Sequence, residues 1–427
     1  MPGRIAEGPS LLLERGHRRH PQYLLATSRT ITSDRTARRV ALTQGQARTT
    51  LLAAAGFAVA APVAALVPHR TDTWLPLHLL LVGALLTAIS GAAPLLAVTW
   101  SAAPAPGTRL VAIQRACIVA GAIGVAGGRE VELDVVTAVG AVLVGVGLAL
   151  LGAILLGIRR RSQVERFDPA IEAYLVAVGL GLLGVALGAV IAAGSPGEWW
   201  GRLRAAHLLL NVLGLVGITI AGTLPYFVAT QARMKMSRRA TPARLRAHLG
   251  VLALATGVAA AGELLERPGV TATGLAGYAA GLVAVATTLP TPGRRQLSWA
   301  GPRLLQLAAG GAWWIAMVVA LAVVQLDDVV SQPRVLRALA VGAFAQILVA
   351  GLAYLGPVLR AGGHERLGAG FATTGSWPGL VLANVAAAAL LLDVRSVALI
   401  AAVGWAVDTG WRGVRLLTDD GGMERPR

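Results

Sequence analysis

Residues 204–228 read RAAHLLLNVLGLVGITIAGTLPYFV, and this stretch decides the class of fold. After Arg204 it contains no charged side chain, and it exceeds the roughly 20 apolar residues that a helix needs to cross a bilayer. Ala, Leu and Gly dominate it, and the alternating pattern of a barrel strand is missing. The stretch therefore predicts a membrane-spanning helix.

Similar blocks recur along the whole chain, which has 427 residues, 55% of them hydrophobic and only 14% charged. Soluble domains carry nearer a quarter charged residues. The twelve predicted spans are 49–67, 74–98, 110–127, 135–157, 171–193, 204–228, 248–264, 270–290, 303–325, 338–357, 377–393 and 396–415. We predict an all-α polytopic membrane protein with about twelve transmembrane helices.

The net charge of +17 is distributed unevenly between the segments that connect the spans. Basic residues gather before the first span, between even- and odd-numbered spans, and after the last span, as in Arg159–Arg161. The opposite segments carry acids such as Glu132 and Glu266. This positive-inside pattern predicts that both termini are cytoplasmic, and the Ala-, Gly- and Arg-rich composition indicates a bacterial plasma membrane. The charge predicts contact with membrane lipids and argues against nucleic acid as a partner.

Three of the predicted spans share a local pattern of small residues. Gly91, Gly222 and Gly351 lie 131 and 129 positions apart, each in the second helix of a group of four. Repeats of this kind indicate related structural units. We therefore predict a basic, disordered cytoplasmic leader at 1–48, four-helix arcs at 49–158, 170–290 and 302–416, and a cytoplasmic tail at 417–427.

Polar side chains inside spans are costly and are therefore candidate functional residues. His78 and His207 lie at similar depths near the outer ends of the second and sixth spans, and Asn211 lies one turn below His207. Arg337 holds the comparable position in the tenth span. Two imidazoles at one depth could coordinate a metal ion or a haem iron. The alternative is that each histidine hydrogen-bonds a neighbouring helix.

Other polar residues receive structural interpretations. We expect Glu172 and Asp408 to meet headgroups or loop arginines, and Gln346 and Asn384 to form interhelical hydrogen bonds. The single cysteine, Cys117, indicates a buried, inert thiol. The chain contains no soluble-enzyme motif, so no catalytic residue is predicted.

Twelve helices in three arcs, with histidines on the second and sixth, resemble subunit I of haem-copper oxidases. The arrangement is more similar to NnrS-type proteins and to membrane regions found with bacterial copper oxidases and nitrite reductases. The segments that carry the resemblance are 77–94, 207–234 and 337–342. The family binds haem and copper through histidines of the second, sixth, seventh and tenth helices. His78 and His207 match the first two, His248 lies at the wrong end of the seventh helix, and Arg337 replaces the histidine of the tenth.

The resemblance therefore implies an incomplete ligand set, which excludes reduction of oxygen or nitric oxide by the family mechanism. Our first hypothesis is a protein that binds one haem or copper ion near the outer face, completed by Asn211, a methionine, water or another subunit, and that serves copper or nitrogen-oxide metabolism. The second is a small-solute permease or channel lined by His78, His207, Asn211 and Arg337. The third is a ligand-free scaffold for a respiratory or copper protein.

Overall fold

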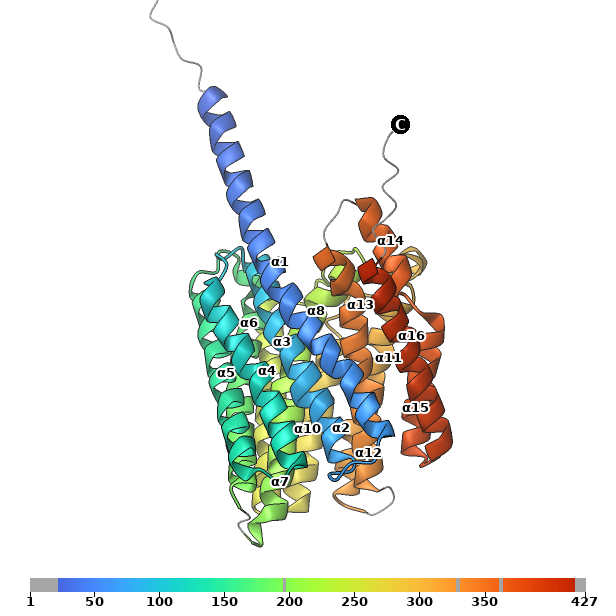
Figure 1. Ribbon diagram of the computed structural model, residues 1–427. Helices are drawn as coiled ribbons and strands as arrows, with labels where there is room; N and C mark the ends of the chain where they lie inside the picture. Colours follow the sequence, from blue (N-terminus) through green and yellow to red (C-terminus); the bar gives the residue numbers. More distant parts are fainter. Residues whose placement is uncertain (1–21, 195–196, 328–330, 361–363, 419–427) are drawn as a thin grey trace, which may run out of the picture.

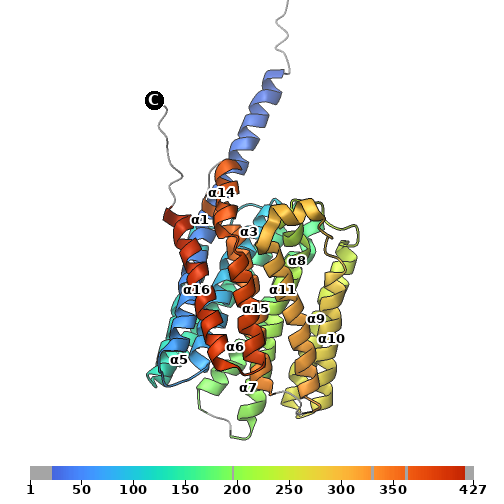
Figure 2. The ribbon, with the colours of Figure 1, turned by 90° about the vertical axis from the view of Figure 1, so that its right-hand side faces the viewer.

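A computed structural model describes residues 22–194, 197–327, 331–360 and 364–418 of the chain. Within these ranges all regular secondary structure is helical, and the long helices run side by side in one bundle (Figure 1, Figure 2). In this described part of the chain, eleven helical segments are long and apolar enough to cross a membrane. The prediction of an all-helical polytopic membrane protein is confirmed at this level.

Eight of these segments contain no π-helical stretch. They are α1 (Gln22–Leu66), α4 (Thr108–Glu130), α5 (Asp134–Arg160), η2 (Glu165–Phe167) with α6 (Asp168–Ala192), α9 (Pro242–Leu264), α10 (Pro268–Ala286), α11 (Arg294–Val324), and α14 (His364–Thr374) with α15 (Trp377–Leu391).

The remaining three segments each contain an internal π-helical stretch. They are α2 (Trp74–His78), η1 (Leu79–Leu86) and α3 (Thr87–Ser101); α7 (Trp199–Leu209), η3 (Leu210–Gly217) and α8 (Ile218–Gln231); and α12 (Gln332–Ala338), η4 (Leu339–Ala345) and α13 (Gln346–Arg360). The π stretches begin at Leu79, Leu210 and Leu339, which are 131 and 129 positions apart. A π stretch is rare and often marks a functional site.

The structure differs from the predicted spans at both ends of the chain. The twelfth predicted span forms α16 (Arg395–Thr418), which packs beside α15 (Figure 2), but α16 is not among the eleven apolar segments because it includes charged residues such as Asp408 and Arg412. Residues 22–48 of the segment expected as a disordered leader belong to α1, since neither Gly nor Pro interrupts the chain between Pro21 and Gly45. Residues 1–21 and 419–427 lie outside the described residues.

The bundle has two ends that differ in their turns. We call one the hairpin end; it contains the turns at Glu132, Glu266 and Asp393, which join α4 to α5, α9 to α10 and α15 to α16. We call the other the terminal end, where α1 enters the bundle and α16 leaves it (Figure 1).

The three hairpin-end turns have the same construction. Glu132, Glu266 and Asp393 all have left-handed backbone conformations, with φ of 57°, 51° and 59°. The residue after each donates its N–H to a carbonyl five residues back, at 2.8, 2.9 and 2.8 Å, which closes the helix in a Schellman motif. Each acid also pairs with an arginine that precedes or opens the second segment of its group. The pairs are Arg70–Glu132, Arg202–Glu266 and Arg334–Asp393.

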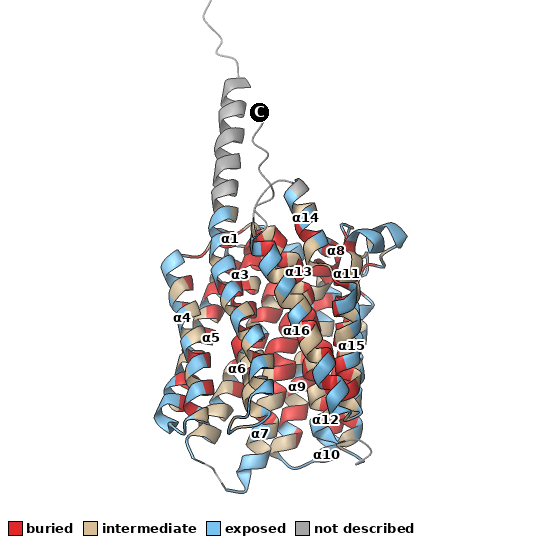
Figure 3. Ribbon diagram, turned by 45° about the vertical axis from the view of Figure 1, so that its right-hand side comes forward, coloured by how far each residue is buried: buried red, intermediate tan, exposed pale blue. Residues whose placement is uncertain are grey.

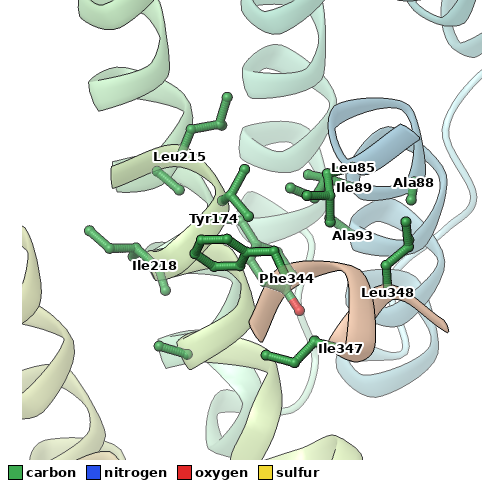
Figure 4. Close-up of a cluster of buried hydrophobic side chains, with 14 of the residues drawn as sticks. Leu85, Ala88, Ile89, Ala93, Tyr174, Leu215, Ile218, Phe344, Ile347 and Leu348 are labelled. Carbon is green, nitrogen blue, oxygen red and sulfur yellow. The ribbon is translucent and has the colours of Figure 1, made fainter. Parts of the chain in front are cut away.

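The three π-containing segments occupy the middle of the bundle, where buried residues concentrate (Figure 3). In their most apolar stretches 67%, 72% and 72% of the residues are buried, against at most 50% in the other spans. Figure 4 shows that Leu85, Ile218 and Phe344 from these segments meet Tyr174 of α6. The outward faces expose large apolar side chains such as Leu254, which suit contact with lipid.

Candidate metal site

His207 is positioned by a row of glycines on α6. Gly188 leaves space for its ring, because a Cβ there would lie 2.6 Å from the His207 Cε1 atom. One turn away Gly184 leaves space for Asn211, since a Cβ would lie 2.4 Å from Nδ2. Glycines at this spacing let two membrane helices approach closely. The His207 and Asn211 side chains are therefore held in a groove of α6.

The hydrogen bonds of His207 determine which ring nitrogen is protonated. Nδ1 lies 2.7 Å from the Gly184 carbonyl oxygen, which accepts only, so Nδ1 donates. The Asn211 Nδ2 group donates to the His207 carbonyl at 2.8 Å, and its 3.3 Å approach to Nδ1 joins two donors. Within the described residues no hydrogen bond reaches His207 Nε2, so this nitrogen keeps its lone pair available.

His78 has the same arrangement by a different route. Its Nδ1 lies 2.9 Å from the carbonyl oxygen of Trp74, one turn earlier, so Nδ1 is again the donor. The His78 ring stacks on the Trp74 ring with centroids 3.8 Å apart and an interplanar angle of 24°. No described residue bonds His78 Nε2. Both histidines thus carry a free Nε2 and an anchored Nδ1, which is the usual state of a metal-binding imidazole.

The two histidines belong to neighbouring segments of the bundle. His78 directly precedes η1 and His207 lies on α7, three residues before η3, and η1 contacts η3. Within the described residues there is no group of three His, Cys, Asp or Glu side chains that could hold a metal ion. A metal bound here would have two side-chain donors from histidine.

Arg337 is held elsewhere, by an acid at the hairpin end. Its Nη2 lies 3.9 Å from Asp393 Oδ1, and its Nε donates to the Pro333 carbonyl at 3.2 Å. Arg334 pairs with the same carboxylate at 3.0 Å. The carboxylate of Asp393, in the turn between α15 and α16, is therefore shared by Arg334 and Arg337.

The other polar residues have structural partners. The amides of Gln346 and Asn384 face each other across α13 and α15 at 3.4–3.5 Å, as predicted, and Trp313 Nε1 donates to Asn384 Oδ1 at 2.8 Å. Glu172 accepts from Arg159 and Arg246, and Asp408 accepts from Arg412. Both acids therefore pair with arginines, but these lie on helices α5, α9 and α16 and not in loops as expected. Cys117, which the sequence analysis expects to be buried, is instead partly exposed on α4, so that expectation is wrong.

A pocket of about 310 Å³ opens at the hairpin end, and sequence reasoning did not find it. The side chains that line it include Glu198, Arg202, Glu263, Thr271 and Gln325. Glu263 Oε1 accepts from Gln325 Nε2 at 3.1 Å, which joins α9 to the end of α11. The sequence signal for this pocket is Glu263, a carboxylate inside the predicted span 248–264.

No protein-family model and no curated protein matches the chain.

Proposed function

We propose that this chain is a haem-copper-oxidase-like, NnrS-like membrane protein of the bacterial plasma membrane that binds one copper ion at His78 and His207. It serves copper or nitrogen-oxide metabolism and is not a terminal oxidase. The observation that carries the proposal is the matched state of the two imidazoles. In both, Nδ1 is anchored on a backbone carbonyl and Nε2 is free, which is how proteins prepare histidine for a metal.

In this proposal the protein consists of three related four-helix units. The π stretches recur at spacings of 131 and 129 positions, beginning at Leu79, Leu210 and Leu339. The arginines of the hairpin-end pairs, Arg70, Arg202 and Arg334, recur at a spacing of 132. The π stretches and the paired arginines thus recur at similar spacings of 129–132 positions, and this agreement supports three repeats of a four-helix arc. His78 and His207 then occupy related places in the first and second arcs.

The orientation follows from the charges. The terminal end holds the basic run from Arg233 to Arg246, whereas the hairpin end holds Glu132, Glu266 and Asp393. The positive-inside rule puts the terminal end, with both chain termini, in the cytoplasm. The two histidines then lie near the outer face, where periplasmic copper has access.

Between the two candidate cofactors, the packing favours copper. A haem needs a planar space between helices, and the apolar side chains of Leu85, Ile218 and Phe344 fill the space between the three central segments (Figure 4). A haem that reached from the histidines into the middle of the bundle would therefore collide with these side chains. Imidazole nitrogens suit copper, and a single ion needs no large cavity. His78 and His207 would hold the ion, and the Gly184 carbonyl orients the His207 ring through its bond with Nδ1.

Metal content tests the proposal directly. The protein is purified in mild detergent after growth with copper, and copper per chain is measured with the visible spectrum. We expect about one copper per wild-type chain and a loss of most of it in His78→Ala and in His207→Ala. His248→Ala is the matched control: His248 lies on α9 near the terminal end, away from the two site histidines, so this variant keeps the metal. Equal copper in wild type and both site variants, or none in wild type, contradicts the proposal.

A second candidate function is a small-solute permease, and the 310 Å³ pocket favours it. The pocket combines a half-buried carboxylate, Glu263, with Gln325 and Thr271, so it suits a small solute that carries hydrogen-bond donors. Flux into liposomes that depends on Glu263 and not on His78 supports this function. Flux that is unchanged in Glu263→Gln argues against it.

A further inference from the structure

α11 is bent at its terminal-end side by a backbone that only glycine adopts readily. Gly301 has φ 60° and ψ −150°, and Pro302 follows it. Residues 294–300 and 302–324 are therefore two helical parts with different directions. Arg303 lies in the first turn of the second part, where the helix dipole already has its positive end.

Arg303 is buried without a compensating charge. Only 3% of it is exposed, and its guanidinium lies 4.0 Å from the centre of the Phe371 ring. Its Nε donates to the Ala300 carbonyl at 3.2 Å, but its Nη1 is buried and has no hydrogen-bond partner. Three residues on, the buried Nε2 of Gln306 also has no partner. In the described part of the chain no carboxylate pairs with Arg303.

A second arginine, Arg233, lies on the neighbouring aromatic ring. Its guanidinium is 3.5 Å from the centre of the Trp299 ring, and Trp299 packs edge-on against Phe371 with centroids 6.1 Å apart. Arg233 follows α8 in a left-handed conformation, with φ 50°. It is exposed, and the described residues give it no ion pair either. The two cations therefore flank one pair of aromatic rings.

This geometry leaves hydrogen-bond donors of both guanidinium groups unused. The aromatic rings cover the flat faces of the two groups, which leaves the planar edge of N–H donors for a ligand. Two positive charges on one pair of aromatic rings, one of them buried, repel each other, and an anion that binds the free N–H edges of both groups relieves that repulsion. The planar fork of arginine matches the oxygens of a phosphate group.

We propose that Arg303 and Arg233 bind a phosphate-type oxyanion at the terminal end, supplied by the headgroup of an anionic phospholipid. The surrounding surface favours the lipid as the source. Arg294 and Arg295 are exposed on the first part of α11, and Arg238 and Arg239 are exposed on the loop after Arg233, so the region attracts an anionic membrane surface. Trp299, 36% exposed, is an aromatic side chain of the kind that membrane proteins place at headgroup level. The site is independent of the histidines and of the proposed metal.

Binding of short-chain phosphatidylglycerol to the delipidated full-length protein in detergent tests the site. We expect Arg303→Gln and Arg233→Gly to weaken binding at least about tenfold, because each removes charge-assisted hydrogen bonds. Glycine suits the left-handed backbone at position 233, so the second variant removes the guanidinium without straining the fold. Arg160→Gln, exposed in the last turn of α5 at the same end of the bundle and outside this region, is the matched control and binds as wild type does. Diacylglycerol, which has the same tails and no phosphate, binds much more weakly.

Inorganic phosphate distinguishes the two sources of the oxyanion. If millimolar phosphate displaces the lipid and shows the same dependence on Arg303 and Arg233, the site is a phosphate site that a free ion also fills. If phosphate does not compete, the lipid headgroup is the ligand. Equal binding of phosphatidylglycerol to wild type and Arg233→Gly, or equal binding of diacylglycerol and phosphatidylglycerol, overturns the proposal. Should Arg303→Gln not fold, Arg233→Gly alone decides.

Discussion

Arg202 and Glu266 form an ion pair at the hairpin end, with 2.6 Å between Nε and Oε1, and this pair joins α7 to the turn between α9 and α10. Glu266 has a left-handed backbone there, with φ 51°. Arg70 with Glu132 and Arg334 with Asp393 repeat both features in the other two units. The three pairs tie the second segment of each unit to the hairpin that follows it.

The repeated turns predict that one substitution has the same effect at three positions. A β-branched residue in the left-handed region is strained, so Glu266→Val should lower the free energy of unfolding by about 1–2 kcal/mol. Glu266→Gly removes an exposed ion pair but relieves the backbone, so the two effects nearly cancel and the change stays within about 1 kcal/mol. Thermal unfolding in detergent measures both. At Glu132 and Asp393 the valine variant should likewise be less stable than the glycine variant. If the glycine variant is the less stable one at any of the three positions, the turns are not equivalent.

The amide cluster between α11, α13 and α15 predicts a measurable coupling. Asn384→Ala leaves Trp313 Nε1 without its acceptor at 2.8 Å and also removes the contact with Gln346. Hydrogen bonds between membrane helices are worth about 0.6–1.7 kcal/mol. A double-mutant cycle of Asn384→Ala with Trp313→Phe should give a coupling in that range from unfolding data. A coupling indistinguishable from zero would contradict the bond.

Sequence reasoning predicted the features that depend on composition and on local pattern. Long apolar blocks require helices because backbone groups in lipid must bond within the segment. Polar amides at Gln346 and Asn384 require a partner on another helix, and the two side chains hydrogen-bond to each other. The spacing of Gly91, Gly222 and Gly351 also identified the second segment of each group, and these are the segments that contain the π stretches.

The remaining features depend on partners that are distant in the chain. The role of Gly184 and Gly188, which is to leave space for Asn211 and His207, depends on how α6 packs in the folded bundle. The partner of Arg337 is Asp393, and no local pattern connects them. The region of Arg303 is formed by α11, α14 and the end of α8, so its aromatic neighbours were invisible in the sequence.

His69, in the loop between α1 and α2, predicts a pH effect at the hairpin end. Its Nδ1 bonds the Val67 carbonyl at 2.8 Å, and the second ring nitrogen bonds the Asp72 carbonyl, so both nitrogens donate when the ring is charged. These bonds, chiefly that to Val67, hold the pKa of His69 above its ordinary 6.5. The two His69 bonds therefore add to the free energy of unfolding below pH 6.5, and this stabilisation is lost as pH rises through the raised pKa. Histidine ring signals in NMR, assigned with His69→Gln, measure the pKa, and a value at or below 6.5 contradicts the loop geometry.

The groove on α6 predicts that a single methyl group disturbs the candidate metal site. In Gly188→Ala the new Cβ would lie 2.6 Å from His207 Cε1, so the ring must move and its 2.7 Å bond to Gly184 weakens. We expect the free energy of unfolding to fall by about 1–3 kcal/mol and copper binding to fall with it.

Gly179 is the matched control on the same helix, because a Cβ there would meet nothing within 4 Å. Gly179→Ala should leave copper unchanged and raise stability by about 0.5–1 kcal/mol, since alanine loses less backbone freedom on folding. Thermal unfolding and copper per chain separate the two variants. If Gly188→Ala is as stable as Gly179→Ala and binds as much copper, then His207 does not depend on the α6 groove, and its orientation is set by another contact.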